Sequence, residues 1–365
     1  MATTSGYGPE EGDRSRRPFH IESVVVDGAP ERVRTDELLS LPGGVLTAFA
    51  RREPVRRQVL VVAPMSGGYA VLMRDLIVTL LREADRVAVT DWRDERFVPA
   101  GTGRPFGFDD NVLHVARMME ALGPGLHVVG VCQGSIPALA ATAFAAEEGR
   151  DGEPLSLALL AAPIDPAINP TRTMALASAH TLDWFDANVV APVPAGFPGA
   201  GRRVYPRAVQ AQLFWSYLAR HMVAADEVAW KVWADDGEDP VRFPWLGTAT
   251  ALLDIPATFF LENIGRIYQE RALATGTLRV ADRLVDPGAI ARTRLLTVEG
   301  EQDDISAAGQ AVPAHDLCRS LPPARRAHAL VERAGHFSLF HGRTLRERVA
   351  PLLRDGFAAA ERSVG

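Results

Sequence analysis

The chain has 365 residues, enough for one large α/β domain with an insertion or for two smaller domains. Hydrophobic residues make up 47% and charged residues 23%, as in ordinary soluble globular proteins. The net charge of -6 argues against a nucleic-acid partner, and no apolar run is long enough to predict a membrane span.

Residues 1–18 are rich in Gly, Ser and charged residues and lack the apolar core of a signal peptide. We therefore expect a disordered N-terminal tail and a cytoplasmic protein. Only two cysteines occur, at no zinc-ligand spacing, so neither a disulfide framework nor a structural zinc is indicated.

The segment that follows, residues 19–165, alternates between strand-like and helix-like runs. The runs 22–28 and 45–52 predict a pair of strands at a sheet edge. Further strands are expected at 57–68, 85–94, 126–132 and 155–165, and helices at 69–84, at 109–123 with Asp109 or Asp110 as the cap, and at 133–149. This alternation predicts a mostly parallel sheet covered by helices.

The pattern changes over residues 166–290, which are rich in Pro, Gly and aromatic residues. Their periodic runs are helical, and no strand alternation is visible. Strands resume at 292–304 and 327–336, with helices at 312–321 and 343–361. We therefore expect an α/β core formed by 19–165 and 291–365, interrupted by a largely helical cap over 166–290.

The stretch Gly130-Val131-Cys132-Gln133-Gly134 joins an apolar strand to an Ala-rich helix. In α/β-hydrolase folds the nucleophile lies on such a turn, spelled G-x-nucleophile-x-G, because larger flanking residues would clash with the neighbouring strand and helix. Cys132 would stand at a helix N-terminus, where the macrodipole favours a thiolate. The alternative is that Cys132 is only a small buried residue.

A cysteine nucleophile needs a base and an acid in the chain order nucleophile, acid, histidine. Of the nine histidines, His336 has this order and follows a strand, whereas His341 is expected at the surface. Asp303 and Asp304 both follow the preceding strand, and we favour Asp303. Asp165, after an earlier strand, is a weaker alternative.

An oxyanion needs two backbone N–H donors. One is expected from Gln133, and the other from the loop 64–68, at Met65 or Ser66. Cys318 lies among apolar neighbours in an expected helix and is predicted to belong to the core.

With these residues in place, the sequence resembles the intracellular poly(3-hydroxybutyrate) depolymerase family of α/β hydrolases. The matching stretches fall within residues 58–340 and are VAPMSGGYAVLMRD, VTDWRD, HVVGVCQGSIPALAA, PIDPAINPT, VPAGFPGAGRRVYP, TVEGEQDDIS and AGHFSLF. The resemblance implies hydrolysis of polyhydroxyalkanoate ester bonds through a thioester acyl-enzyme. It carries the nucleophile to Cys132, the acid to Asp303 and the base to His336.

The chain departs from the family pattern at two positions. Proline is common where Gly134 stands, and histidine is common where Gly68 stands. A Gly-x-Cys-x-Gly turn is also found in polyhydroxyalkanoate synthases, so a synthase-like acyltransferase is one alternative. A cysteine-dependent small-ester or lactone hydrolase is the second, and a hydrolase relic that only binds polymer is the third.

The expected partner is polyhydroxyalkanoate polymer or oligomer, with association of the enzyme with granules in the cytoplasm as a further expectation. No cofactor, metal, nucleic acid or membrane span is expected. Aromatic residues of the cap could line an apolar groove for the polymer or could form the core of the cap; the candidates for the groove are Trp215, Tyr217, Trp230, Trp233 and Phe243.

Overall fold

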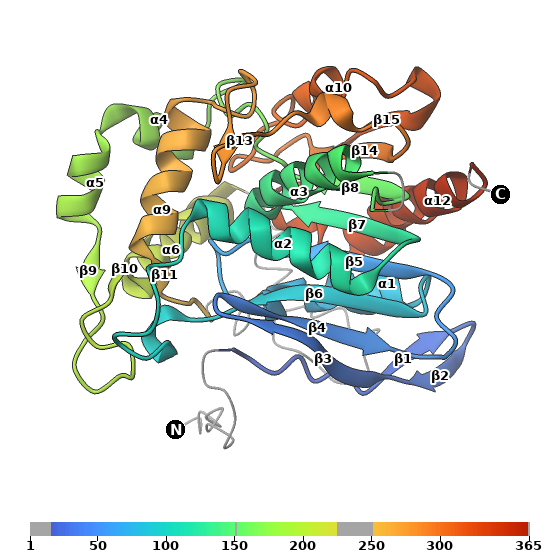
Figure 1. Ribbon diagram of the computed structural model, residues 1–365, viewed down its shortest axis with the longest axis horizontal. Coiled ribbons are helices and arrows are strands. Elements are labelled where there is room, and N and C mark those ends of the chain that lie inside the picture. Colours follow the sequence, from blue (N-terminus) through green and yellow to red (C-terminus); the bar gives the residue numbers. More distant parts are fainter. Residues whose placement is uncertain (1–15, 150–151, 225–250, 364–365) are drawn as a thin grey trace.

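The computed structural model describes residues 16–149, 152–224 and 251–363. A twisted central sheet carries helices on both faces, and a group of helices and short strands gathers at one end of it (Figure 1). The hydrophobic core follows the sheet, with the strands β4, β7 and β8 buried along their whole length. The layers of an α/β protein, predicted from the alternating pattern, are confirmed.

The central sheet has eight strands in the order β15-β14-β8-β7-β5-β6-β4-β3. All neighbouring strands pair in parallel except β4, which runs antiparallel to both β6 and β3. The strands are β3 (Arg34–Leu41), β4 (Gly44–Ala50), β5 (Gln58–Val62), β6 (Arg86–Trp92), β7 (Leu126–Val131), β8 (Ser156–Leu160), β14 (Arg294–Gly300) and β15 (Arg326–Val331). The central strands are Val- and Leu-rich because helices cover them on both sides.

The prediction that residues 22–28 and 45–52 pair with each other at a sheet edge is wrong. β1 (Ser23–Val26) pairs with β2 (Ala29–Arg32) in a separate hairpin, and β3 is the neighbour of β4. Asp27 and Gly28, with φ of 50° and 82°, form the two-residue turn of this hairpin. Positive φ at both positions is the geometry of a type I′ turn, for which Asp-Gly is a preferred sequence.

The core helices are α1 (Arg74–Leu81), α2 (Phe108–Leu122), α3 (Ser135–Glu148), α10 (Pro313–Leu317), α11 (Gly342–Thr344) and α12 (Ala350–Glu361). The N-cap of α2 is Gly107, not Asp109 or Asp110 as predicted. The Gly107 N–H donates to the Asp110 carboxylate at 2.8 Å, so Asp110 closes the first turn from inside the helix. Asp109 instead accepts from the Ala281 N–H at 3.0 Å.

The segment between β8 and β14 contains α4 (Arg172–Ala179), α5 (Leu182–Asn188), α6 (Arg207–Ala224) and α9 (Ala257–Asn263), which continues into a π-helix, Ile264–Gln269. It also contains short strands that the sequence did not predict: β9 (Ala191–Pro192), β10 (Arg203–Tyr205) and β11 (Ile255–Pro256) in one sheet, and β12 (Arg279–Val280) with β13 (Arg283–Leu284) in another. Strands of two or three residues are too short to show alternation. We refer to residues 166–290 as the cap.

An ion pair and a buried hydrogen bond join the cap to the core. Arg271 donates to the Asp165 carboxylate, just after β8, at 2.8 and 2.6 Å. Asp94, fully buried after β6, forms an ion pair with Arg96 and accepts from the Asp254 N–H at 3.2 Å. A buried carboxylate is stable only when its oxygens are paired in this way.

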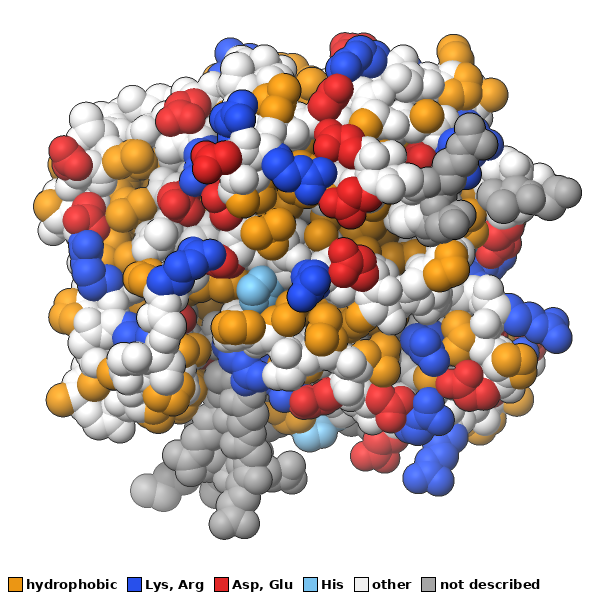
Figure 2. Space-filling view, viewed as in Figure 1, with side chains coloured by type: hydrophobic (Ala, Val, Ile, Leu, Met, Phe, Trp, Pro, Cys, Tyr) orange, Lys and Arg blue, Asp and Glu red, His pale blue; other side chains and the backbone are white. Residues whose placement is uncertain are grey.

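Residues 16–18, expected in the N-terminal tail, lie against the core at its edge. The Arg16 guanidinium is 3.2 Å from the Asp91 carboxylate, and Phe19 packs edge-on against Phe49 with ring centroids 5.0 Å apart. Acidic and basic side chains are interspersed over the face drawn in Figure 2. None of the helices in the described ranges combines the length and apolar character needed to cross a bilayer.

Candidate active site

The turn after β7 has the geometry expected of a nucleophile elbow. Cys132 follows the strand with a φ of 49°, and the backbone passes through one 3-10 turn into α3. This left-handed conformation is uncommon for a residue other than glycine, and such residues concentrate at functional sites. The Cys132 side chain is partly exposed.

The two glycines of the elbow allow the turn to pack closely against the neighbouring helix and strand, as the sequence predicted. A Cβ atom at Gly130 would lie 2.7 Å from the Cα of Ser135, at the start of α3. A Cβ atom at Gly134 would lie 2.2 Å from the carbonyl oxygen of Val62, at the end of β5. Both distances are shorter than van der Waals contact, so glycine is required at each position.

His336 and Asp303 meet at the carboxyl ends of β15 and β14. Nδ1 of His336 lies 2.7 Å from Oδ2 of Asp303, and both side chains are buried. Since a carboxylate can only accept, Nδ1 carries the proton and donates it. The other oxygen of Asp303 accepts from the N–H groups of Ile305 and Ser306 at 2.8 and 2.9 Å, which fixes the orientation of the carboxylate.

The two alternative acids lie elsewhere in the hydrogen-bond network. Asp304 is only half-buried, and the carboxylate that accepts from His336 belongs to its neighbour Asp303. Asp165 is bound in two places by Arg271, which occupies both of its oxygens. The geometry therefore favours Asp303 as the residue that orients the histidine.

The Cys132 thiol lies within electrostatic range of the imidazole of His336, so the predicted nucleophile, base and acid lie at one place. Burial lowers the pKa of His336, but the negative charges of Asp303 and Cys132 and the hydrogen bond to Asp303 raise it by more. The pKa of His336 therefore lies well above its usual value.

Aromatic rings enclose the imidazole. Phe337 and Phe340 meet the His336 ring edge-to-face, with centroids 5.5 and 5.6 Å away. Phe214, on the cap helix α6, packs against Phe337 with centroids 5.9 Å apart. The cap therefore reaches the immediate surroundings of the site.

The predicted oxyanion residues lie beside the elbow in an arrangement that the sequence did not predict. The side-chain oxygen of Gln133 accepts from the N–H groups of both Met65 and Ser66, at 3.2 and 3.0 Å. The Gln133 side-chain amide in turn donates to Ser66 Oγ at 3.1 Å. The two candidate donors of the loop 64–68 thus both donate to the side-chain oxygen of Gln133.

Tyr268, in the π-helix of the cap, is a further residue near the nucleophile. Burial raises the pKa of Tyr268, and negative charge on Cys132 raises it further, so the phenol and the thiol lie within electrostatic range. Within the described ranges its hydroxyl has no hydrogen-bond partner. No motif or spacing in the sequence singles out this tyrosine, because its proximity arises only when the cap folds over the elbow.

The remaining predicted residues have varied outcomes. Trp215 lies half-exposed on α6, while Trp230, Trp233, Phe243 and the side chain of Tyr217 lie outside the described residues. Cys318 is fully buried, and burial raises its pKa to about 12, so its predicted place in the core is confirmed.

His341 differs from its predicted place at the surface. It is half-buried, with Nδ1 3.3 Å from the Asp75 carboxylate, because the turn after Phe340 folds back onto α1. Across the described ranges, no three His, Cys, Asp or Glu side chains are grouped so as to hold a metal ion.

Comparison with known proteins places the chain among hydrolases. The family model described as PHB de-polymerase C-terminus matches residues 161–361, which is more than half of the chain. No curated protein matches the chain.

Solved structures share the fold at low identity. The α/β hydrolase GrgF from Penicillium sp. sh18 is 12% identical, with a TM-score of 0.51 over 91% of this chain and 98% of that one. A bacterial membrane phospholipase A is 14% identical, with a TM-score of 0.50 over 90% of this chain and 87% of that one. The chain therefore has the α/β-hydrolase fold and belongs to the PHB de-polymerase C-terminus family.

Proposed function

We propose that this hydrolase cleaves the ester bonds of polyhydroxyalkanoate in the cytoplasm, at the surface of polymer granules, with Cys132 as nucleophile, His336 as base and Asp303 as the residue that orients the base. The observation that carries the proposal is the place of Cys132, on a strained turn after β7 and within electrostatic range of His336, which donates to Asp303 at 2.7 Å. Membership of a depolymerase family supports the polymer as substrate. Leu213 and Trp215, both about half-exposed on α6, give the cap an apolar surface for such a polymer.

The reaction proceeds in two acyl-transfer steps. The Cys132 sulfur, as thiolate paired with protonated His336, attacks the ester carbonyl carbon. The tetrahedral intermediate collapses when Nε2 of His336 gives its proton to the leaving alcohol oxygen, which breaks the C–O bond and leaves a thioester on Cys132. His336 then takes a proton from water, the hydroxide attacks the thioester, and the hydroxyacid leaves as the thiolate is restored.

The negative oxygen of each tetrahedral intermediate needs N–H donors. We assign one to the backbone N–H of Gln133 and the other to Met65 or Ser66. The Gln133 side-chain oxygen already occupies the point at which the Met65 and Ser66 donors converge. In the reaction the oxyanion takes the place of that oxygen for at least one of the two donors.

The test is the release of soluble 3-hydroxybutyrate from native amorphous granules, measured with and without coenzyme A. We expect Cys132→Ala to bind granules and release no product, and Cys318→Ala, the matched change at the other cysteine, to retain activity. Release by Cys132→Ala at the wild-type rate would show that the site is wrongly assigned. Formation of polymer and free coenzyme A from 3-hydroxybutyryl-coenzyme A would instead identify an acyltransferase, the activity that the Gly130-x-Cys132-x-Gly134 turn also allows.

The choice of acid is tested by comparing two neighbouring substitutions. Asp303→Asn removes the acceptor that holds the proton on Nδ1 of His336, and we expect kcat to fall by about 10⁴-fold. Asp304→Asn changes the same charge one residue away and should leave kcat within a few-fold of the wild type. The reverse order of the two effects would assign the acid to Asp304.

A further inference from the structure

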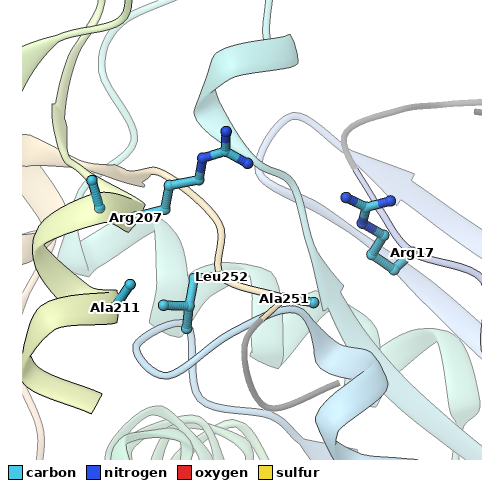
Figure 3. Close-up of a pocket in the computed structure, with 6 residues that line it drawn as sticks. Arg17, Arg207, Ala211, Ala251 and Leu252 are labelled. Atoms are coloured by element: carbon cyan, nitrogen blue, oxygen red, sulfur yellow. The ribbon is translucent and has the colours of Figure 1, made fainter. Parts of the chain in front are cut away.

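A small pocket lies between three segments: the N-terminal segment, the first turns of α6, and residues 251–252. Its volume is about 250 Å³, and it is lined by Arg17, Arg207, Ala208, Ala211, Ala251 and Leu252. We call it the arginine pocket. Figure 3 shows Arg17 and Arg207 on different segments, with Leu252 and Ala251 below them in that view.

Neither guanidinium of the arginine pocket forms an ion pair with a carboxylate in the part of the chain that the structure describes. The Arg17 guanidinium lies over the ring of Tyr69, 5.3 Å from its centroid, and forms no ion pair with a described carboxylate. The backbone N–H of Arg207 donates to Asp254 at 2.7 Å. Burial raises the pKa of Asp254 and the positive charge of Arg207 opposes that shift, but the guanidinium forms no ion pair with a carboxylate within the described ranges. Two positive charges at one pocket in a chain of net charge -6 point to an anionic ligand.

The size and lining of the pocket narrow the chemistry of that ligand. Small-molecule pockets usually span about 300 to 1,000 Å³, so a pocket of about 250 Å³ suits a ligand of a few carbon atoms. The other lining residues are alanines and one leucine. Arginine recognises carboxylates through paired N–H donors, and an aliphatic wall suits a short hydrocarbon chain.

The arginine pocket is also connected to the candidate oxyanion loop. The carbonyl oxygen of Ala251 accepts from the Tyr69 N–H at 3.1 Å, directly after the loop 64–68. A Cβ atom at Gly68 would lie 3.1 Å from the same Ala251 oxygen. A ligand that contacts Ala251 therefore touches a residue that itself packs on the loop beside the elbow.

We propose that the arginine pocket binds the carboxylate of a short 3-hydroxyacid, either the free product or the carboxyl end of a polyester chain. This inference rests on the proposed function for the identity of the acid. The two guanidiniums hold the carboxylate, and the alanines and Leu252 contact the aliphatic part. The pocket thus gives the enzyme a second point of recognition, outside the elbow, for a chain end or a released monomer.

The experiment is isothermal titration of the Cys132→Ala protein, which cannot turn over ester, with 3-hydroxybutyrate, its linear dimer acid, its neutral methyl ester and inorganic phosphate. We expect both acids to bind, with the methyl ester and phosphate at least about tenfold weaker. Tighter binding of the dimer acid would identify the chain end as the ligand, and tighter binding of the monomer the product. Arg17→Gln and Arg207→Gln, each added to Cys132→Ala, should weaken acid binding by about tenfold or more.

The matched control is Arg172→Gln, which removes the same charge from an exposed arginine at the start of another cap helix, α4. It should leave the affinity unchanged, and circular dichroism should show all variants folded. Equal affinity for the acid and its methyl ester, equal affinity for phosphate, or unchanged binding in both Arg17→Gln and Arg207→Gln would overturn the proposal. Binding needs no turnover, so acid binding by Cys132→Ala together with a wild-type protein that leaves granules intact would refute the depolymerase proposal alone.

Discussion

Gln133 connects two parts of the site through its side chain. One amide group makes three hydrogen bonds to Met65 and Ser66, which ties the loop after β5 to the residue that follows the nucleophile. Since a buried N–H without an acceptor costs free energy, this side chain fixes both N–H groups in one direction. We infer that Gln133 is a positioning residue for the oxyanion loop in addition to its predicted backbone role.

Substitutions of Gln133 should separate loop positioning from charge. In Gln133→Ala the Met65 and Ser66 donors lose their acceptor, so we expect a loss of about 1 to 3 kcal/mol in the free energy of unfolding together with a lower kcat. Gln133→Glu keeps an acceptor but places a negative charge next to the developing oxyanion. We expect nearly wild-type unfolding in denaturant with a kcat lowered by at least about 100-fold. Wild-type kcat in Gln133→Glu would contradict the role of this loop.

Part of the site could be predicted from the sequence because it follows from topology. Cys132, Asp303 and His336 each lie in the segment that follows a strand of the parallel sheet, and the ends of such strands meet at one edge. Their proximity was therefore predictable, while their catalytic roles stay predictions. The Gln133 side-chain bonds and the place of Tyr268 depend on how a loop and the cap pack, which no local pattern encodes.

At the scale of elements, the long apolar runs were predicted well and the short strands were not. Strands such as β5 and β7 are buried on both faces and read as continuous Val and Leu, a pattern that tertiary contacts do not override. The hairpin β1–β2 was missed, although Asp27-Gly28 is a turn signal. The strands β9 to β13 of the cap have two or three residues each and carry no periodicity.

We expect the free energy of unfolding to depend steeply on the glycines of the elbow. In Gly134→Ala the new methyl group would overlap the Val62 carbonyl oxygen, which belongs to the backbone of a central strand and cannot move away. We expect a loss of about 3 kcal/mol or more in the free energy of unfolding, measured by denaturant titration. Gly152→Ala is the control, because its nearest neighbour would lie 3.5 Å away, and it should change stability by less than about 0.5 kcal/mol. Equal stability of the two variants would show that the turn is not tightly packed.

At the scale of the whole molecule, His127 joins the sheet to the last helix. Its Nδ1 lies 2.8 Å from Ser156 Oγ on β8, and its ring packs on Phe357 of α12 with centroids 4.5 Å apart. Burial lowers the pKa of His127 to about 4, although the negative charge of Glu361 opposes the shift. At neutral pH the histidine is therefore neutral, and its contact with Glu361 is a hydrogen bond and not an ion pair.

This buried histidine should make the fold sensitive to mild acid. In the unfolded chain a histidine binds its proton near pH 6.5, whereas in the folded protein His127 does so near pH 4. The unfolded state thus binds more protons between these values, so stability falls as the pH is lowered from 6.5 towards 4, by up to about 3 kcal/mol. Denaturant unfolding of wild type and His127→Gln from pH 7 to 5 should show a steeper decline in the wild type. Parallel curves would exclude His127 as the cause.

The adjacency of β8 and β14 has a consequence for how this enzyme can diversify. The two strands pair in parallel from Ser156 with Arg294 to Leu160 with Val298, so the chain leaves the sheet after β8 and returns to it as the neighbouring strand. The entropy of closing such an excursion grows only with the logarithm of its length, at about 0.6 kcal/mol for each doubling. Lengthening, trimming or exchanging what lies between them leaves the pairing of the sheet intact. The cap is thereby free to vary while the strands beneath it keep their places.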